Sequence, residues 1–231
     1  MAVIQTENIA LKVNGEEAWG YLARPDDAET HPGVVLIQEW WGVEPHIQDL
    51  AHKLATEGFV VFVPDLYHGK IATEPNDAQK MLMTTIQNMG LVIQEVSSAL
   101  DYVKALPGVE PKKLGIMGFC LGGRIAWEMA SIYDGLGAVV PFYGGGYDPS
   151  PEQAAKITAP VLAVYGEQDG SIPQEQIQKI EQTMKEAGRK VEIKVFPAGH
   201  AFLNPDHGMG HEESAKIAWP MAITFLKENL K

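Results

Sequence analysis

Short apolar runs that alternate with helix-like stretches constrain the fold of this chain more than any other feature. Runs rich in Val, Ile and Leu occupy 33–39, 59–64, 113–118, 137–144, 159–166 and 191–197. Helical patterns fall at 47–58, 75–89, 91–106, 121–133, 173–187 and 211–229. Strands that are apolar along their whole length need cover on both faces, which is typical of a parallel sheet flanked by helices. We therefore expect an α/β fold with a mostly parallel central sheet and helices on both faces.

The start of the chain has a different pattern. The segments "ALKV" and "AWGYLA" flank Asn14-Gly15, which is a strong two-residue turn signal. This arrangement predicts an antiparallel hairpin ahead of the parallel sheet.

No Ser/Gly linker, charge block or internal repeat divides the 231 residues, so the sequence predicts a single domain over 1–231. The net charge of −12 argues against nucleic acid or an anionic membrane surface as a partner, because both attract clustered Lys and Arg. The sequence shows no signal peptide, and no apolar run reaches the ~18 residues of a membrane span. One cysteine allows no intrachain disulfide, so we expect a soluble, cytoplasmic protein.

That single cysteine, Cys120, stands in "GFCLGG", between an apolar run and a helical pattern. The G-x-C-x-G spacing is that of a nucleophile elbow, with Cys in the place of Ser. Gly118 and Gly122 would relieve crowding in a sharp strand-to-helix turn. The backbone N–H of Leu121 would lie at a helix N-terminus, where partial positive charge favours a thiolate and an oxyanion. The alternative is a buried structural cysteine, which is the usual state of a free Cys.

A catalytic elbow also needs a base and an acid that orients it. Asp169 follows the run 159–166, and His200 follows the run 191–197. This is the chain order of nucleophile, acid and histidine in the α/β-hydrolase plan. Because parallel strands share a carboxyl edge, the three side chains are expected to meet there. Taken singly, Asp169 could stabilise a turn and His200 could be an ordinary loop histidine.

The other histidines carry weaker signals. His46 and His68 fall in expected loops near the carboxyl edge, where they could line a pocket. His207 and His211 have a metal-like spacing, but the glycines between them argue against a helix, and we predict no metal site.

The segments "GFCLGG", "GEQDGSIP" and "PAGHAF", together with "QEWWG", "VPDLY" and "FYGGG", resemble the dienelactone hydrolase family of α/β hydrolases. The resemblance implies an α/β-hydrolase fold and hydrolysis of esters or lactones without a cofactor. By motif, it implies Cys120 as the nucleophile, His200 as the base and Asp169 as the residue that orients the base.

The same resemblance implies a role for Glu39, at the end of the first buried strand. Its carboxylate would meet the resting thiol and take the sulfur's proton as substrate arrives. The alternative is a carboxylate that only caps or stabilises a loop. The backbone N–H groups of Trp40 and Leu121 would then form the oxyanion hole.

The sequence departs from the family's best-known members in one place. Those members hold a dienelactone carboxylate with arginines, whereas "DLYHGK" and "GHAFLNPDHG" contain none. The predicted pocket is instead rich in aromatic side chains, each of which could equally belong to the core: Trp40, Trp41, Tyr67, Phe119, Tyr143 and Phe202. An apolar or neutral ester or lactone suits such a pocket better than an anionic one.

The sequence thus predicts a cysteine-dependent hydrolase of small-molecule esters or lactones that acts through a Cys-His-Asp triad and a thioester. One alternative is a non-catalytic α/β-hydrolase relative that binds a small ligand. Another is a thiol redox sensor, although the chain has no second cysteine to resolve a sulfenic acid. The sequence does not predict an oligomeric state.

Overall fold

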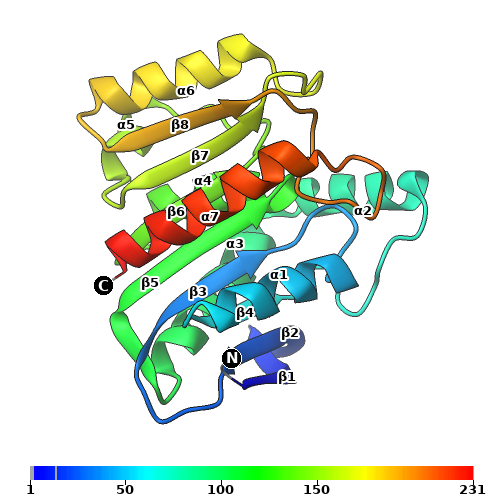
Figure 1. Cartoon of the computed structure of the whole chain (residues 1–231), viewed down its shortest axis with the longest axis vertical. Helices are drawn as coiled ribbons and strands as arrows, with labels where there is room; N and C mark the ends of the chain where they lie inside the picture. The colour runs from blue at the N-terminus through cyan, green and yellow to red at the C-terminus, as the bar shows by residue number, and fades with distance from the viewer. Residues whose placement is uncertain (1–2, 14, 231) are drawn as a thin grey trace. The chain divides into compact units, whose positions relative to one another are not determined.

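A computed structural model of the chain describes residues 3–13 and 15–230. It divides into two compact units, Met1–Leu114 and Gly115–Lys231, and the division falls inside strand β5 (Val109–Phe119). Each unit is an α/β arrangement of its own (Figure 1). The prediction of one domain over the whole chain stays a prediction.

The first unit contains strands in the order β1-β2-β4-β3. Their bounds are β1 Ile4–Val13, β2 Glu16–Pro25, β3 His31–Ile37 and β4 Val60–Pro64. β1 pairs antiparallel with β2 from Ile4↔Pro25 to Val13↔Glu16, which confirms the predicted hairpin, although Asn14 of its turn lies outside the described residues. β3 and β4 are parallel, and each is buried over most of its length, as their continuous apolar sequences require.

The helices of the first unit are α1 (Pro45–Thr56), α2 (Pro75–Gln87) and α3 (Met89–Ala105). α1 packs against β2 and β4, and α3 packs against β3 and β4. In Figure 1, α1 lies in front of β4 and α3 lies behind it, so this part of the sheet is covered on both faces. α2 buries only Ala78 and Thr85 and lies largely in solvent.

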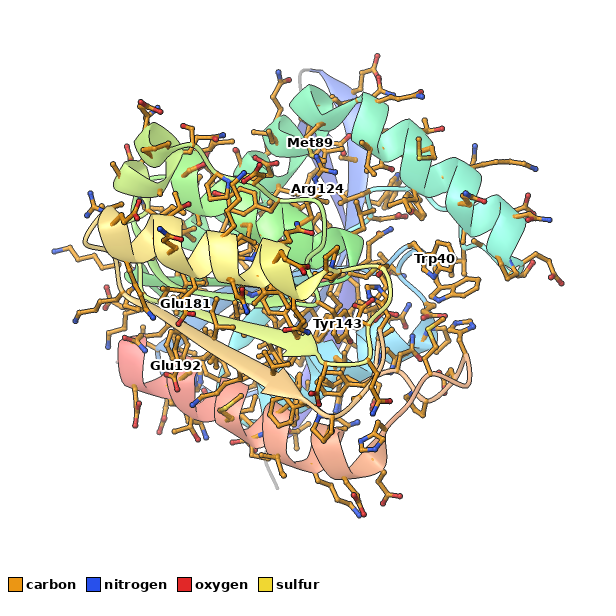
Figure 2. The ribbon with its side chains drawn as sticks, turned by 90° about the horizontal axis from the view of Figure 1, so that it is seen from above. Trp40, Met89, Arg124, Tyr143, Glu181 and Glu192 are labelled. Atoms are coloured by element: carbon orange, nitrogen blue, oxygen red, sulfur yellow. The ribbon has the colours of Figure 1, made fainter. Side chains whose placement is uncertain are left out.

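The second unit contains the end of β5 and the strands β6 (Leu136–Phe142), β7 (Val161–Gly166) and β8 (Val191–Phe196), in that order. β6 is parallel to β7, and β7 is parallel to β8. The helices are α4 (Leu121–Ile132), α5 (Pro151–Lys156), α6 (Gln174–Glu186) and α7 (Glu212–Asn229). Figure 2 shows α6 on one side of β7 and β8 and α7 on the other. The carboxyl ends of these parallel strands therefore lie at one edge, where the predicted site residues follow them.

The structure confirms the predicted α/β fold, with shifts of a few residues at most element ends. One element was missed: α5 is a six-residue helix, too short to show an amphipathic period. Its capping box, in which Ser150 and Gln153 cap each other's backbone N–H groups, is the signal that marks its start.

Candidate active site

Cys120 occupies a sharp turn between β5 and α4. Its backbone has φ 54° and ψ −112°, in a left-handed region that a residue with a side chain rarely adopts. A Cβ atom at Gly118 would lie 2.1 Å from the carbonyl oxygen of Gly122, so glycine at position 118 permits the close approach that the turn needs. The predicted elbow geometry is therefore present in the structure.

The elbow is tied to the neighbouring strand. The backbone N–H of Cys120 donates to the carbonyl of Phe142 at the end of β6 (3.0 Å), and the Arg124 N–H donates to the Cys120 carbonyl (3.1 Å). A Cβ at Gly123 would lie 2.3 Å from that same Phe142 oxygen. These contacts hold the sulfur-bearing residue at the N-terminus of α4, whose dipole favours negative charge.

Two loops from adjacent strands carry the acid and the base. Asp169 follows β7 and His200 follows β8. The N–H of Glu167 donates to the carbonyl of Phe196 (2.7 Å), and the N–H of Gln168 donates to that of Ala198 (2.9 Å), so the two loops continue the pairing of their strands. The structure thereby brings Asp169 and His200 together, as their places in the sequence predict.

The imidazole of His200 lies against the carboxylate of Asp169. Nδ1 is 2.6 Å from Oδ2, and the Asp169 side chain is only 1% exposed. An ionised carboxylate has no proton to donate, so Nδ1 is the donor in this bond. When His200 is neutral, its proton is therefore on Nδ1, and the other ring nitrogen, Nε2, can accept a proton.

The positive charge of protonated His200 and the negative charge of Asp169 stabilise each other. Burial lowers the pKa of His200, but hydrogen bonds to Asp169 and Cys120 and their negative charges outweigh it and raise the pKa to about 10. Burial raises the pKa of Asp169, but hydrogen bonds from His200 and Ser171 outweigh it, so this pKa lies below its ordinary value. The imidazole thus contacts the carboxylate directly, and its pKa responds to both Asp169 and Cys120.

The ring of Tyr143 packs against His200, and other aromatic side chains pack against Tyr143. The Tyr143 ring lies 5.2 Å from the His200 ring and 5.6 Å from that of Phe202, and Phe119 stacks on Phe142 at 4.9 Å. Figure 2 shows Tyr143 near the carboxyl end of β7. Phe119, Tyr143 and Phe202 are fully buried, so in this structure they form an apolar wall behind the imidazole. Their role as substrate-pocket residues stays a prediction.

Ser171 was not among the predicted site residues. Its Oγ donates to Oδ1 of Asp169 (2.5 Å), and its backbone N–H donates to the same oxygen (2.9 Å). The signal in the sequence was the D-x-S spacing, in which the aspartate accepts from the residue two positions on, as in an Asx-turn.

Of the remaining predicted residues, Leu121 is the first residue of α4 in the second unit, and the others lie in the first unit. Glu39 is buried and forms an isolated antiparallel bridge with Gly42. Trp40 and Trp41 pack edge to face at 5.1 Å, in a small apolar cluster with Ala72, Ala78 and Met81. Tyr67 is buried, and its N–H donates to Asp65 (3.0 Å). The roles of Glu39, Trp40, Trp41 and Tyr67 at the sulfur stay predictions.

The other histidines serve local structure where their contacts are described. His211 accepts a hydrogen bond from the Ser214 N–H (3.3 Å) and caps α7, and the segment with His207 before it is not helical, as predicted. His68 lies 3.3 Å from Glu95 within the first unit, and His46 is buried near the start of α1. Over 3–13 and 15–230, no three His, Cys, Asp or Glu side chains gather as they would around a metal ion. Among the helices in these residues, none is long and apolar enough to span a membrane.

Known proteins resemble this chain along almost its full length. The model of the dienelactone hydrolase family matches residues 19–230. A protein of Salmonella typhimurium, named as a candidate carboxymethylenebutenolidase, is 39% identical over 95% of this chain and 86% of its own. A crystal structure from Klebsiella pneumoniae, described as a candidate dienelactone hydrolase, has a TM-score of 0.89 at 32% identity and covers 97% of this chain and 99% of that one.

A further solved structure, of a dienelactone hydrolase-like promiscuous phosphotriesterase from metagenomic libraries, shares the fold over the whole of both chains. Its TM-score is 0.92 at 21% identity. The two structural likenesses confirm the predicted α/β-hydrolase fold.

Proposed function

Because this chain belongs to the dienelactone hydrolase family, we propose that it hydrolyses small-molecule esters or lactones, with Cys120 as nucleophile, His200 as base and Asp169 as the residue that orients the base. One observation carries the proposal: Nδ1 of the His200 ring lies 2.6 Å from the Asp169 carboxylate, and interaction with Cys120 helps to raise the pKa of the same ring. An imidazole placed between a carboxylate and a sulfur is the arrangement that activates a weak nucleophile.

In the acylation step, the proton of the Cys120 thiol passes to His200, and the raised pKa of His200 keeps that proton on the imidazole while the sulfur attacks. The sulfur attacks the ester carbonyl carbon, a C–S bond forms, and the carbonyl electrons move onto oxygen. When this tetrahedral species collapses, the C–O bond to the alcohol breaks and the His200 imidazolium returns the proton to the departing oxygen. The product is a thioester on Cys120 and a free alcohol, which in a lactone remains tethered to the acyl group.

In the deacylation step, His200 takes a proton from a water molecule as the water oxygen attacks the thioester. The C–S bond then breaks, the acid leaves, and the sulfur regains its proton from His200. Asp169 stays ionised throughout, since its lowered pKa keeps it charged near neutral pH, and it stabilises the imidazolium in both steps.

The negative oxygen needs hydrogen-bond donors. The N–H of Leu121, the first residue of α4, is one proposed donor, and the Trp40 N–H is the second. Glu39 is proposed to hold the thiol before substrate arrives. The roles of Trp40 and Glu39 rest on the family pattern alone.

For the substrate, we propose a neutral or apolar acyl group. The segments where the best-known family members carry arginines hold none here, and the net charge of −12 works against an anionic ligand. We further propose the cytoplasm as the compartment, because a catalytic thiolate persists best where thiols are kept reduced.

A trapping experiment tests the proposed function. The protein is mixed with an aryl ester, quenched in acid within one turnover, and analysed by intact mass and peptide mapping. We expect one acyl group, as a thioester on Cys120, that decays as the free acid appears. A ligand-binding relative without activity would show neither the adduct nor release of the aryl alcohol, and this result would contradict the proposal.

A further inference from the structure

We propose that Ser171 is a positioning residue of the candidate active site, because its hydroxyl and backbone N–H hold one oxygen of Asp169 so that the other faces His200. This inference rests on the proposed function, since it assigns Ser171 to the same site. Ser171 belongs to the loop between β7 and α6.

The carboxylate of Asp169 is held from two sides. Oδ1 accepts from the Ser171 hydroxyl (2.5 Å) and from the Ser171 N–H (2.9 Å). Oδ2 accepts from Nδ1 of His200 (2.6 Å). Rotation of the carboxylate about its Cβ–Cγ bond would break bonds on both sides, so the donors of Ser171 select the orientation in which Oδ2 faces the imidazole.

The hydroxyl acts through Asp169. The Ser171 oxygen lies 3.4 Å from Nδ1 of His200, considerably farther than the Asp169 oxygen at 2.6 Å. Nδ1 therefore donates chiefly to the carboxylate, and the serine hydroxyl gives its own proton to the same carboxylate. Ser171 thus supports the acid and does not replace it.

The support has an electrostatic consequence. Burial penalises the negative charge of Asp169, and the hydrogen bonds from His200 and Ser171 offset that penalty. The titratable groups that act on this pair are few: Asp169 and Cys120 act on His200, and His200 acts on Asp169, while the Tyr143 ring lies against the imidazole. Loss of the hydroxyl should let the carboxylate rotate away from Nδ1, and the poorer geometry of this bond should lower the pKa of His200.

The test compares Ser171→Ala and Ser171→Thr with Ser97→Ala, a control that removes a serine hydroxyl bonded only to the Ile93 carbonyl on α3. The readout is an NMR titration of the histidine ring protons in the resting protein, with the His200 signal assigned by its absence in His200→Gln. This measurement needs no substrate, and a purely structural role for Ser171 would not move it.

We expect the Ala variant to lower the His200 pKa by roughly 0.5 to 1 unit, and kcat for an aryl ester to fall about 3- to 10-fold with little change in KM. The Thr variant, which keeps a hydroxyl, should restore both values, and Ser97→Ala should match the wild type. A His200 titration in Ser171→Ala that overlays the wild-type curve would overturn the inference.

Two further comparisons keep the result decisive. If Ser171→Ala does not fold, Ser171→Thr and Ser171→Val have nearly the same shape and differ by the hydroxyl, so equal His200 titrations in that pair would also overturn the inference. A separate assay tests the proposed function. Ester hydrolysis that persists in Cys120→Ala would refute that function, whatever the titration shows.

Discussion

Nδ1 of His200 and Oδ2 of Asp169 lie 2.6 Å apart, although 31 positions separate the two residues in the chain. Their loops leave the carboxyl ends of the adjacent parallel strands β8 and β7, and backbone hydrogen bonds continue the pairing beyond both strands. The sheet register therefore sets the distance between acid and base, and the following predictions depend on that relationship.

Replacement of the nucleophile should abolish hydrolysis. We expect Cys120→Ala to lose turnover of an aryl ester by on the order of 10⁴ or more, because no other thiol exists to form the acyl-enzyme. Initial rates with 4-nitrophenyl acetate and thermal unfolding curves would be measured together. Near-wild-type rates in a folded Cys120→Ala protein would refute the role of Cys120.

Neutralisation of the acid should slow the reaction without unfolding the protein. Asp169→Asn keeps the shape of the side chain but removes the charge that stabilises the imidazolium, so we expect kcat to fall by on the order of 10² to 10⁴. Labelling of Cys120 by a thiol reagent under mildly denaturing conditions should match the wild type. An Asn variant that unfolds would instead indicate that Asp169 serves the turn rather than the chemistry.

The pH dependence of stability follows from the two shifted groups. The pKa of His200 is raised from 6.5 to about 10, so its stabilising contribution is complete below pH 6.5 and is lost as pH rises through about 10. Asp169 has a lowered pKa, so its contribution is present above its ordinary value of 3.8 and is lost as pH falls further.

Urea unfolding at pH 6 and at pH 10.5 checks this sign, with the second pH chosen about half a unit above the folded pKa. The difference in unfolding free energy between wild type and His200→Gln should be largest at pH 6 and should shrink at the higher pH. His52→Gln, at an exposed position in the middle of α1, serves as the control. A difference that grows with pH would contradict the raised pKa.

The close approach of the two loops should not tolerate a methyl group at Gly166. A Cβ there would lie 2.4 Å from the Ala198 carbonyl oxygen, so Gly166→Ala should separate the loops that carry Asp169 and His200. We expect a loss of about 1–3 kcal/mol in unfolding free energy and at least a ~10-fold fall in kcat.

Gly170, in the loop that follows β7, provides a control, because a Cβ added there meets no atom within 4 Å. Gly170→Ala should change stability by less than ~1 kcal/mol. Equal effects of the two substitutions on stability and on kcat would remove the argument for a tight loop contact.

The charge of the substrate forms a separate prediction. Without arginines in the segments "DLYHGK" and "GHAFLNPDHG", we expect kcat/KM for a neutral lactone to exceed that for a matched lactone bearing a carboxylate by at least ~10-fold. Paired assays at low and high salt would measure this. A preference for the anionic lactone that weakens as salt is added would show that some other cation binds the carboxylate.

The sequence by itself predicted most of the fold and selected the residues of the proposed triad. Apolar runs with no polar alternation indicated buried parallel strands, and the G-x-C-x-G spacing indicated an elbow, because backbone crowding at such a turn leaves room only for glycine on either side. A Cβ at Gly118 would indeed lie 2.1 Å from the Gly122 oxygen. Asp169 and His200 could be selected because residues that directly follow parallel strands share one edge.

Tertiary structure decided what depends on packing at a distance. The sequence did not single out Ser171, since a serine two positions from an aspartate is common in turns. Its place beside Asp169 in the candidate site is seen only in the folded loop. Phe119, Tyr143 and Phe202 were predicted for the pocket, and the structure places them fully buried, with the ring of Tyr143 against His200. Local spacing in the sequence constrains the backbone over only a few residues. The partners of a side chain depend on which strands become neighbours, and burial of the whole sheet decides the order of the strands.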